Sequence, residues 1–199
     1  MIPVKPQPEP VGFDVKVRRK GMKWLKRNLA DITSPLPSGT KIPDYWTDCL
    51  DELCSSYDRI CAYVCVYIER VTGNPNVEHF APKSLYPNLA YEWSNYRLVC
   101  GLMNIRKSNL EDVLDPFTLQ SATFQIDFLD GKTFANPRIA LTRRAAAQDT
   151  IDRLKLSDDD CCAVRLEYFE AYRAGDISGQ QLKRRAPFVY LEMKRQKLL

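Results

Sequence analysis

The chain has 199 residues, of which 45% are hydrophobic and 27% are charged, and its formal net charge is +4. This composition is typical of a folded globular protein and excludes an intrinsically disordered chain. A chain of this length can bury a core as one domain with additions or as two small domains. No apolar run approaches the roughly 20 residues that span a bilayer, and the start of the chain lacks the apolar core of a signal peptide. We therefore expect a cytoplasmic protein with no membrane partner.

Seven cysteines occur in the chain, at positions 49, 54, 61, 65, 100, 161 and 162. Their number is odd and no secretion signal is present, so a disulfide framework is not expected. Most of them should be buried thiols.

The basic residues are concentrated in two runs. Seven of them lie between Asp14 and Arg27, where Asp14 is the one acid: Lys16, Arg18, Arg19, Lys20, Lys23, Lys26 and Arg27. Six more lie near the C-terminus, interrupted by Glu192: Lys183, Arg184, Arg185, Lys194, Arg195 and Lys197. Two such runs could together bind a phosphate backbone, although either one is as readily a solvated face.

Residues 1–43 are predicted to form an extended, basic and Pro-rich N-terminal arm. Four prolines within residues 1–13 favour an extended segment that lies over the surface or reaches a partner. A short helix is expected around Met22–Leu25, broken on its near side by Gly21. Residues 31–43 are expected to form a loop.

Residues 44–137 are predicted to form the central unit of the chain, in which a helical apolar pattern is followed by extended ones. The expected elements are a helix over 44–60, a strand over 62–71, a turn over 73–76, strands over 77–80 and 96–100, a helix over 101–109, and a small β region over 111–137 with a hairpin turn at Asp130-Gly131.

Residues 138–199 are predicted to form a helical C-terminal extension. Helix start signals, helix end signals and apolar spacing divide it into three parts. These are a helix marked by Ala147, Ile151 and Leu154, a helix that begins at Ser157 and ends near Gly175, and a basic segment from about residue 178 that Pro187 interrupts.

The chemistry-bearing residues lie around the single histidine, His79, which directly follows Glu78. Two asparagines come later, Asn95 in Trp-Ser-Asn-Tyr and Asn104 in Asn-Ile-Arg-Lys. A carboxylate and an amide oxygen are ligands that Mg²⁺ or Mn²⁺ accepts, and a neutral histidine suits a general base. Along a strand, Glu78 and His79 would point to opposite faces unless the strand ends or bends at the histidine.

These elements, in this order, resemble the ββα-metal motif of the HNH endonucleases. The resemblance implies an α+β protein with a ββα-metal (HNH) core, an added small β region and a helical C-terminal extension. It also implies a metal-dependent endonuclease that hydrolyses phosphodiester bonds in DNA. Glu78 and Asn104 would bind one Mg²⁺ or Mn²⁺ ion, His79 would activate water, and Asn95 would complete the catalytic set by holding the loop and the histidine.

Cations near the motif and in the arm are candidates for nucleic-acid binding. The candidates are Lys83, Arg106, Lys107, Arg18, Arg19 and Lys20. An exposed cation on a helix is otherwise simply solvated.

Many HNH proteins also carry a structural zinc ion held by two Cys-x-x-Cys pairs. The corresponding positions here begin at Cys61 and Cys100, but Val64 and Met103 replace the second cysteine of each pair. Even if Cys65 substituted for Val64, only three thiolates would be present, so a structural zinc is not expected.

A wider similarity, over roughly two thirds of the chain from Asp51 onward, includes the stretches 77–84, 91–96 and 114–117. It resembles the HNH subfamily found as the nuclease subunit of Septu and related retron antiphage systems. This implies a role in bacterial defence and a partner ATPase. Two alternatives stay open: a non-catalytic nucleic-acid-binding or assembly subunit with the same fold, and a nuclease that cleaves RNA.

Overall fold

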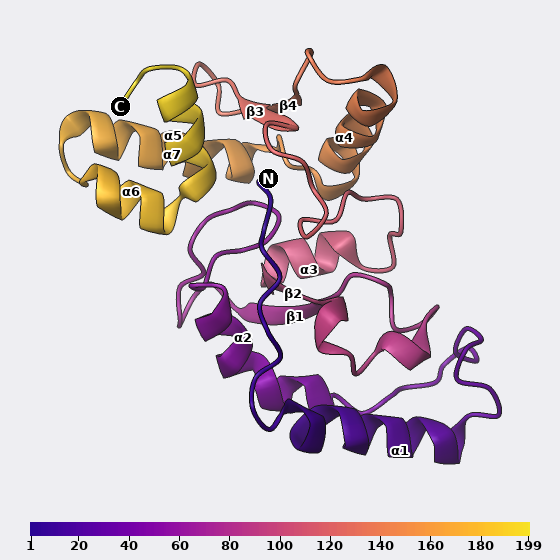
Figure 1. Ribbon diagram of the computed structural model, residues 1–199. Helices are drawn as coiled ribbons and strands as arrows, with labels where there is room; N and C mark the ends of the chain where they lie inside the picture. Colours follow the sequence, from indigo (N-terminus) through magenta and orange to yellow (C-terminus); the bar gives the residue numbers. More distant parts are fainter.

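The computed structural model describes all residues, 1–199, and shows a mixture of helices with two small sheets (Figure 1). The helices are α1 (Arg19–Asn28), α2 (Leu50–Ser56), α3 (Gly101–Lys107), α4 (Leu141–Leu154), α5 (Asp159–Ala174), α6 (Gly179–Arg185) and α7 (Pro187–Arg195). The strands are β1 (Pro75–His79), β2 (Tyr96–Cys100), β3 (Phe124–Ile126) and β4 (Thr133–Ala135). Short helical turns are η1 (Asp14–Arg18), η2 (Tyr45–Cys49), η3 (Pro87–Leu89) and η4 (Trp93–Asn95). The structure is therefore α+β, as predicted.

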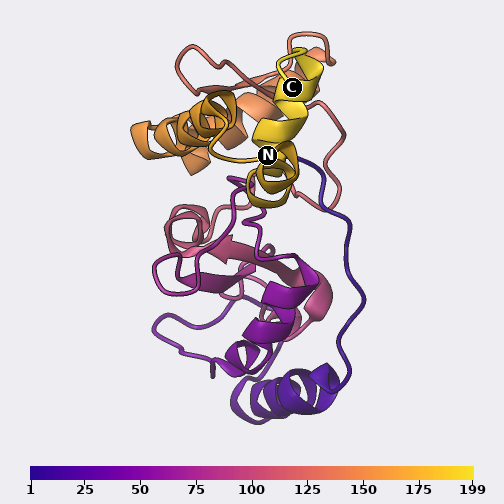
Figure 2. The ribbon, with the colours of Figure 1, turned by 90° about the vertical axis from the view of Figure 1, so that its left-hand side faces the viewer.

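The antiparallel pair β1–β2 lies in the middle of the molecule, and α3 follows β2 directly. Its register runs from Pro75 opposite Cys100 to His79 opposite Tyr96. In both views α1 and α2 lie at one end, and the C-terminal helices lie with β3 and β4 at the other (Figures 1 and 2). The order of a strand, a second strand and a helix matches the prediction for this region.

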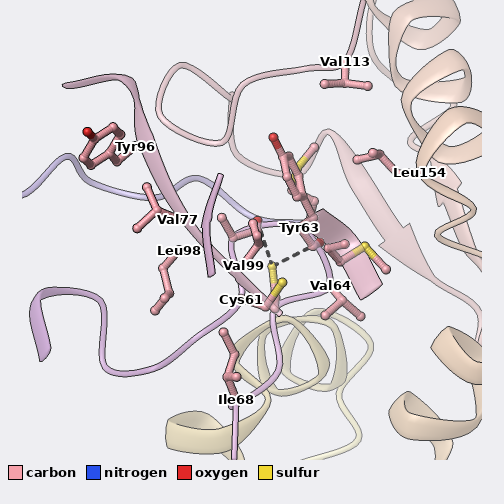
Figure 3. Packing of buried hydrophobic residues seen from close by; sticks show 14 of the residues in the cluster. Cys61, Tyr63, Val64, Ile68, Val77, Tyr96, Leu98, Val99, Val113 and Leu154 are labelled. Carbon is pink, nitrogen blue, oxygen red and sulfur yellow. Dashed lines mark hydrogen bonds between the residues drawn. The ribbon is translucent and has the colours of Figure 1, made fainter. Parts of the chain in front are cut away.

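One hydrophobic cluster of 38 buried residues runs through all three predicted segments of the chain. Figure 3 shows part of it, where Val77 of β1 lies beside its partner Leu98 of β2, with Ile68 and Leu154 of α4 at other sides of the cluster. Burial of apolar surface contributes roughly 25 cal/mol per Å². The strand pair therefore depends on side chains from both ends of the chain for its stability.

The N-terminal segment runs along the side of the molecule to α1 (Figure 2). The Val4 N–H donates to the Pro116 carbonyl at 2.8 Å, and the indole N–H of Trp93 donates to the Gln7 carbonyl at 2.9 Å. Met1 is buried. Of the two arrangements that the prolines favour, the structure shows the one in which the arm lies over the surface.

Gly21 does not break the N-terminal helix, contrary to the prediction. Helical structure continues from η1 through α1 as far as Asn28. A Cβ atom at Gly21 would lie 2.1 Å from the ring of Tyr91. The glycine is needed for this close approach of the helix to the aromatic ring, and it is tolerated because helix propensity is a weaker effect than packing.

The strand predicted over residues 62–71 is not formed. The segment is a series of turns with one isolated bridge, between Ile60 and Tyr67, and the Ala62 N–H donates to the Leu98 carbonyl at 2.8 Å. Cys65 has a φ of 59°, which no strand allows. The apolar side chains here are buried as a compact turn under the β1–β2 pair, and the preference of β-branched residues for strands is overridden by that burial.

The helix predicted over residues 44–60 is shorter and begins differently. The η2 turn over Tyr45–Cys49 leads into α2, which ends at Ser56. Asp58 and Arg59 then have φ values of 50° and 57°, a left-handed conformation that stops the helix.

The loop after α3 is fixed to β2 by a buried ion pair. The guanidinium of Arg97 donates to the two carboxylate oxygens of Asp115 at 2.8 and 2.7 Å. Its carbon lies 3.5 Å from the centre of the Phe117 ring. A bidentate pair of this kind defines the position of the loop relative to the sheet.

The C-terminal part contains the predicted β region and helices. β3 and β4 form a hairpin that is shorter than predicted. α7 covers the edge of β3, because the Glu192 carboxylate accepts from the Ile126 N–H and the Gln196 amide donates to the Ile126 carbonyl, each at 2.9 Å. No helix of the protein is both long enough and apolar enough to cross a bilayer.

Two glycines with positive φ provide a test of the packing between the β3–β4 turn and α5. Gly131 has a φ of 74°, and a Cβ there would lie 2.5 Å from the Cys162 carbonyl oxygen, whereas Gly175 has a φ of 83° and no atom within 4 Å of such a Cβ. We expect Gly175→Ala to lower the free energy of unfolding by about 1–2 kcal/mol. Gly131→Ala should lower the free energy of unfolding by at least about 1 kcal/mol more than Gly175→Ala does, because the new methyl group would clash with the backbone carbonyl of Cys162. Urea denaturation of both variants measures the difference, and equal losses would contradict the packing described.

Candidate active site

A cavity of about 530 Å³ opens where β1 ends, between the loop that follows it, α3 and the residues around η2. β1 ends at His79, and Glu78 and His79 are both among the residues that line this cavity, although the Oε1 atom of Glu78 is closed off from solvent. Asn104 of α3 lies on its wall as well. The remaining lining residues that are used below are Asp44, Trp46, Thr47, Lys83 and Ile105. Three of the four residues that the sequence assigns to the catalytic and metal site are thus brought together.

His79 is held by a hydrogen bond that determines its tautomer. Its Nε2 atom lies 2.9 Å from the Ala90 carbonyl oxygen, which can only accept, so Nε2 carries the proton. The Nδ1 atom is therefore left with a free lone pair. The ring packs edge-on against Trp46 and Tyr96, with centroids 4.6 and 5.2 Å away. Burial, helped by the charge of Lys83, lowers the pKa of His79 to about 3, so the imidazole is neutral at cellular pH.

Asn95 does not line the cavity but holds the loop that shapes it. Its side chain accepts from the Ala81 N–H at 2.8 Å and donates to the carbonyls of Ala81 and Leu89 at 3.0 and 3.1 Å. Leu89 precedes Ala90, the residue whose carbonyl orients His79. Asn95 is thus a positioning residue, which agrees with the holding role expected of it and not with direct participation in catalysis.

Glu78 is almost completely buried, with 2% of its surface exposed. The Tyr63 hydroxyl donates to its Oε2 at 3.0 Å, and the Lys107 ammonium lies 3.1 Å from its Oε1. The geometry at Oε1 does not form a hydrogen bond. Burial raises the pKa of Glu78, and the attraction of Lys107 opposes this shift. One carboxylate oxygen therefore has an ionic neighbour but no hydrogen-bond donor.

Two of the predicted nucleic-acid contacts, Lys107 and Arg106, are engaged inside the protein. Lys107 is completely buried and donates to the Phe80 carbonyl at 2.9 Å in addition to its ion pair with Glu78. Arg106 pairs with Asp158 and donates to the Lys155 carbonyl at 3.1 Å. Neither cation is available to a phosphate. Their actual roles are to neutralise Glu78 and to connect α3 with the start of α5, respectively.

The predicted contacts in the arm are also occupied by carboxylates. Arg18 pairs with Glu92 at 3.0 Å and with Glu9, and Lys20 pairs with Asp48 at 3.1 Å. The exposed Arg19 pairs with Asp14, which lies within the same run.

Lys83 is the predicted cation that does reach the cavity. Its ammonium lies 4.3 Å from the centre of the Trp46 ring, and burial lowers its pKa. Nothing but the ring and the charge of Asp44 balances it there. Lys83 is therefore placed to contact an anion in the cavity.

Two residues of the site carry oxygen atoms of the kind that a small divalent ion accepts. Glu78 Oε1 has no hydrogen bond, and the Asn104 amide lies on the same cavity wall. No group of three or more histidine, cysteine, aspartate or glutamate residues is arranged to hold a metal. Glu78 and Asn104 are the residues that could contribute oxygen ligands here, and the Glu78 oxygen lies against the Lys107 ammonium.

Of the cysteines that the sequence compares with zinc ligands, Cys61 precedes β1 and Cys100 is the last residue of β2. Cys61 and Cys65 are buried, and a hydrogen bond with the Cys61 thiol lowers the pKa of Cys100. Met103 is buried in the hydrophobic core. All seven cysteines of the chain are free thiols.

Two residues of the site carried no recognisable signal in the sequence. Trp46 forms a wall against both His79 and Lys83, but its apolar spacing indicates only helix packing. Tyr63 donates to Glu78, but it lies in the run that reads as a strand. Their roles depend on contacts between distant segments, and no local pattern records these.

In comparisons with known proteins, no family model and no curated protein matched the chain. The geometry of the cavity is therefore the basis for assigning a function.

The ion pair of Glu78 and Lys107 can be tested by a double-mutant cycle. We expect Lys107→Met to lower the free energy of unfolding by about 3–5 kcal/mol, because it leaves a buried carboxylate without its partner. The double variant Glu78→Gln, Lys107→Met should be more stable than Lys107→Met alone. Urea denaturation in EDTA measures all four proteins. Additive effects would show that the two groups do not interact.

The loop-holding role of Asn95 is tested by comparing Asn95→Ala with Asn88→Ala. Asn88 lies in the same region, and its side chain makes no hydrogen bond. Asn95→Ala removes three hydrogen bonds and should cost about 2–4 kcal/mol, whereas Asn88→Ala should cost about 0.5 kcal/mol or less. Thermal or urea denaturation measures both. A loss of similar size in the two variants would contradict the role.

Proposed function

We propose that this protein is a metal-dependent endonuclease of the HNH type that hydrolyses phosphodiester bonds in DNA. The observation that carries the proposal is that Glu78, His79 and Asn104 line one cavity, with His79 fixed so that Nδ1 keeps its lone pair. In this proposal the cavity would bring together a neutral base, two oxygen ligands for a metal ion and a cation. This set is what phosphodiester hydrolysis needs.

His79 acts as the general base in this proposal. Nδ1 takes a proton from a water molecule in the cavity as the water oxygen attacks phosphorus. The bond from phosphorus to the leaving oxygen then breaks, and that oxygen takes up a proton from solvent. The Ala90 carbonyl accepts from Nε2 throughout, so it keeps the ring oriented and stabilises the imidazolium that forms.

Glu78 and Asn104 hold the divalent ion in this proposal. When bound there, Mg²⁺ or Mn²⁺ supplies positive charge that stabilises the phosphorane and the leaving oxygen. Burial raises the pKa of Glu78, and the Lys107 ammonium opposes that shift by favouring the ionised carboxylate. Lys83 contacts a non-bridging oxygen of the phosphate, because its ammonium lines the cavity without a carboxylate partner.

The biological setting belongs to the same proposal and rests on the wider sequence resemblance. The nuclease would be the effector of a bacterial antiphage system, and a partner ATPase would control its access to DNA. Activity of the isolated protein would then be low, and cleavage would increase when the partner is added.

The test is cleavage of supercoiled plasmid by the purified protein with Mg²⁺ or Mn²⁺. We expect nicking that EDTA abolishes and that His79→Ala and Asn104→Ala each lower by about 100-fold or more, since general-base catalysis contributes roughly 10²–10⁴-fold. Asn104→Ala is the cleaner variant, because its side chain bonds to nothing in the fold. Asn88→Ala serves as the matched amide control and should retain full activity.

Isothermal titration with Mn²⁺ separates the remaining outcomes. RNA would be assigned as the substrate if the protein bound Mn²⁺, if Asn104→Ala weakened that binding, and if the protein cleaved a structured RNA but not the plasmid. Neither Mn²⁺ binding nor cleavage of either nucleic acid would overturn the enzymatic proposal. The protein would then be a non-catalytic subunit that keeps the fold.

A further inference from the structure

The two halves of the helix formed by η1 and α1 differ in how their cations are paired. In the first half Lys16, Arg18, Arg19 and Lys20 each form an ion pair with a carboxylate. In the second half Lys23, Lys26 and Arg27 are exposed, and no carboxylate lies within ion-pair distance of any of them. The free positive charge of this helix is therefore concentrated in its last two turns.

Aromatic side chains lie among these free cations. A hollow of about 280 Å³ at this end of α1 is lined by Lys23 and Arg27 together with Trp24 and Tyr45. Lys20 lies at the same hollow, 5.7 Å from the centre of the Tyr45 ring. Half-buried aromatic rings beside unpaired cations are typical of surfaces that bind a nucleic-acid strand.

The hollow adjoins the cavity that holds His79. Tyr45 lines the hollow, while its neighbours Asp44, Trp46 and Thr47 line the cavity. Successive Cα atoms are about 3.8 Å apart, so one short stretch of backbone separates the two. A strand whose phosphate is in contact with Lys83 in the cavity can thus continue across Tyr45 to the end of α1.

We propose that Lys23, Lys26 and Arg27, with Trp24 and Tyr45, form the surface that binds the sugar–phosphate backbone of the substrate DNA next to the scissile phosphate. This inference rests on the proposed nuclease function for the identity of the ligand. The DNA-binding cations of the N-terminal basic run are then those in the last two turns of α1. Arg18, Arg19 and Lys20, which the sequence suggested, are neutralised by carboxylates. Charge complementarity carries the proposal, since Lys23, Lys26 and Arg27 are exposed and unpaired, and Lys23 and Arg27 line the hollow together with Tyr45.

The test is DNA binding in EDTA, where no cleavage occurs, by fluorescence anisotropy of a labelled duplex. The variant is Lys23→Gln, Lys26→Gln, Arg27→Gln, which removes the three charges and keeps a similar helix propensity. The matched control is Arg138→Gln, Arg144→Gln, Lys155→Gln. These three cations are exposed and unpaired and lie on or beside α4, at the opposite end of the molecule from α1 (Figure 1). Both variants have the same net charge.

We expect the α1 variant to bind about 10-fold or more weakly near 0.1 M salt. The slope of log K against log salt concentration should become shallower by about 2–3, because each lost phosphate contact removes about 0.9. The control variant should bind as the unmodified protein does. The proposed surface would be wrong if the α1 variant bound DNA as tightly as the unmodified protein. It would also be wrong if the control variant lost as much affinity as the α1 variant, or if the unmodified protein did not bind DNA.

This readout is independent of catalysis. If the unmodified protein binds DNA through α1 but never cleaves it, the proposed DNA-binding surface is supported and the nuclease proposal is wrong. If it cleaves plasmid and the α1 variant binds equally well, the nuclease proposal stands and the surface fails. Circular dichroism of both variants confirms that α1 is intact.

Discussion

The arrangement of this protein depends on the opposite charges of Glu78 and Lys107, buried side by side between β1 and α3. Neither group is accessible to water, and removing both from solvent is costly unless they stay together. Because one is contributed by the strand and the other by the last turn of the helix, their attraction determines how α3 sits against the hairpin. The position of Asn104, one turn earlier on α3, follows from that arrangement. The ion pair of Glu78 and Lys107 thus fixes the position of the cavity wall that Asn104 belongs to.

A second constraint acts on the other side of the cavity. The loop between β1 and β2 is tied by Asn95 to Ala81 and Leu89, and this places the carbonyl of Ala90 against His79. The Tyr96 hydroxyl donates to the same carbonyl at 2.9 Å. The histidine is therefore oriented by backbone that two β2-side residues hold in place. An exposed histidine on a free loop would have no defined tautomer.

The sequence allowed the strand pair, the helix after it and the grouping of Glu78, His79 and Asn104 to be predicted, because turn residues and short apolar runs bound these elements closely. It did not reveal that residues 62–71 form turns. A buried β-branched run has the same composition in a strand and in a packed turn, and only the contact with Leu98 distinguishes them. Likewise Gly21 reads as a breaker until the ring of Tyr91 is known to lie against it. The cations were hardest to assign, since whether Arg106, Lys107 or Arg18 is free depends on carboxylates and carbonyls far away in sequence.

The contact of Arg106 with Asp158 has a consequence for how such a protein can change in evolution. Arg106 lies two positions after Asn104 on α3, and its charge is absorbed at the start of α5. Replacement of the C-terminal helices by an unrelated segment would leave the Arg106 guanidinium without its partner and would also remove this contact of α3. The helical extension and the site are thus constrained to be inherited as one unit, unless a new acid arises to take the place of Asp158.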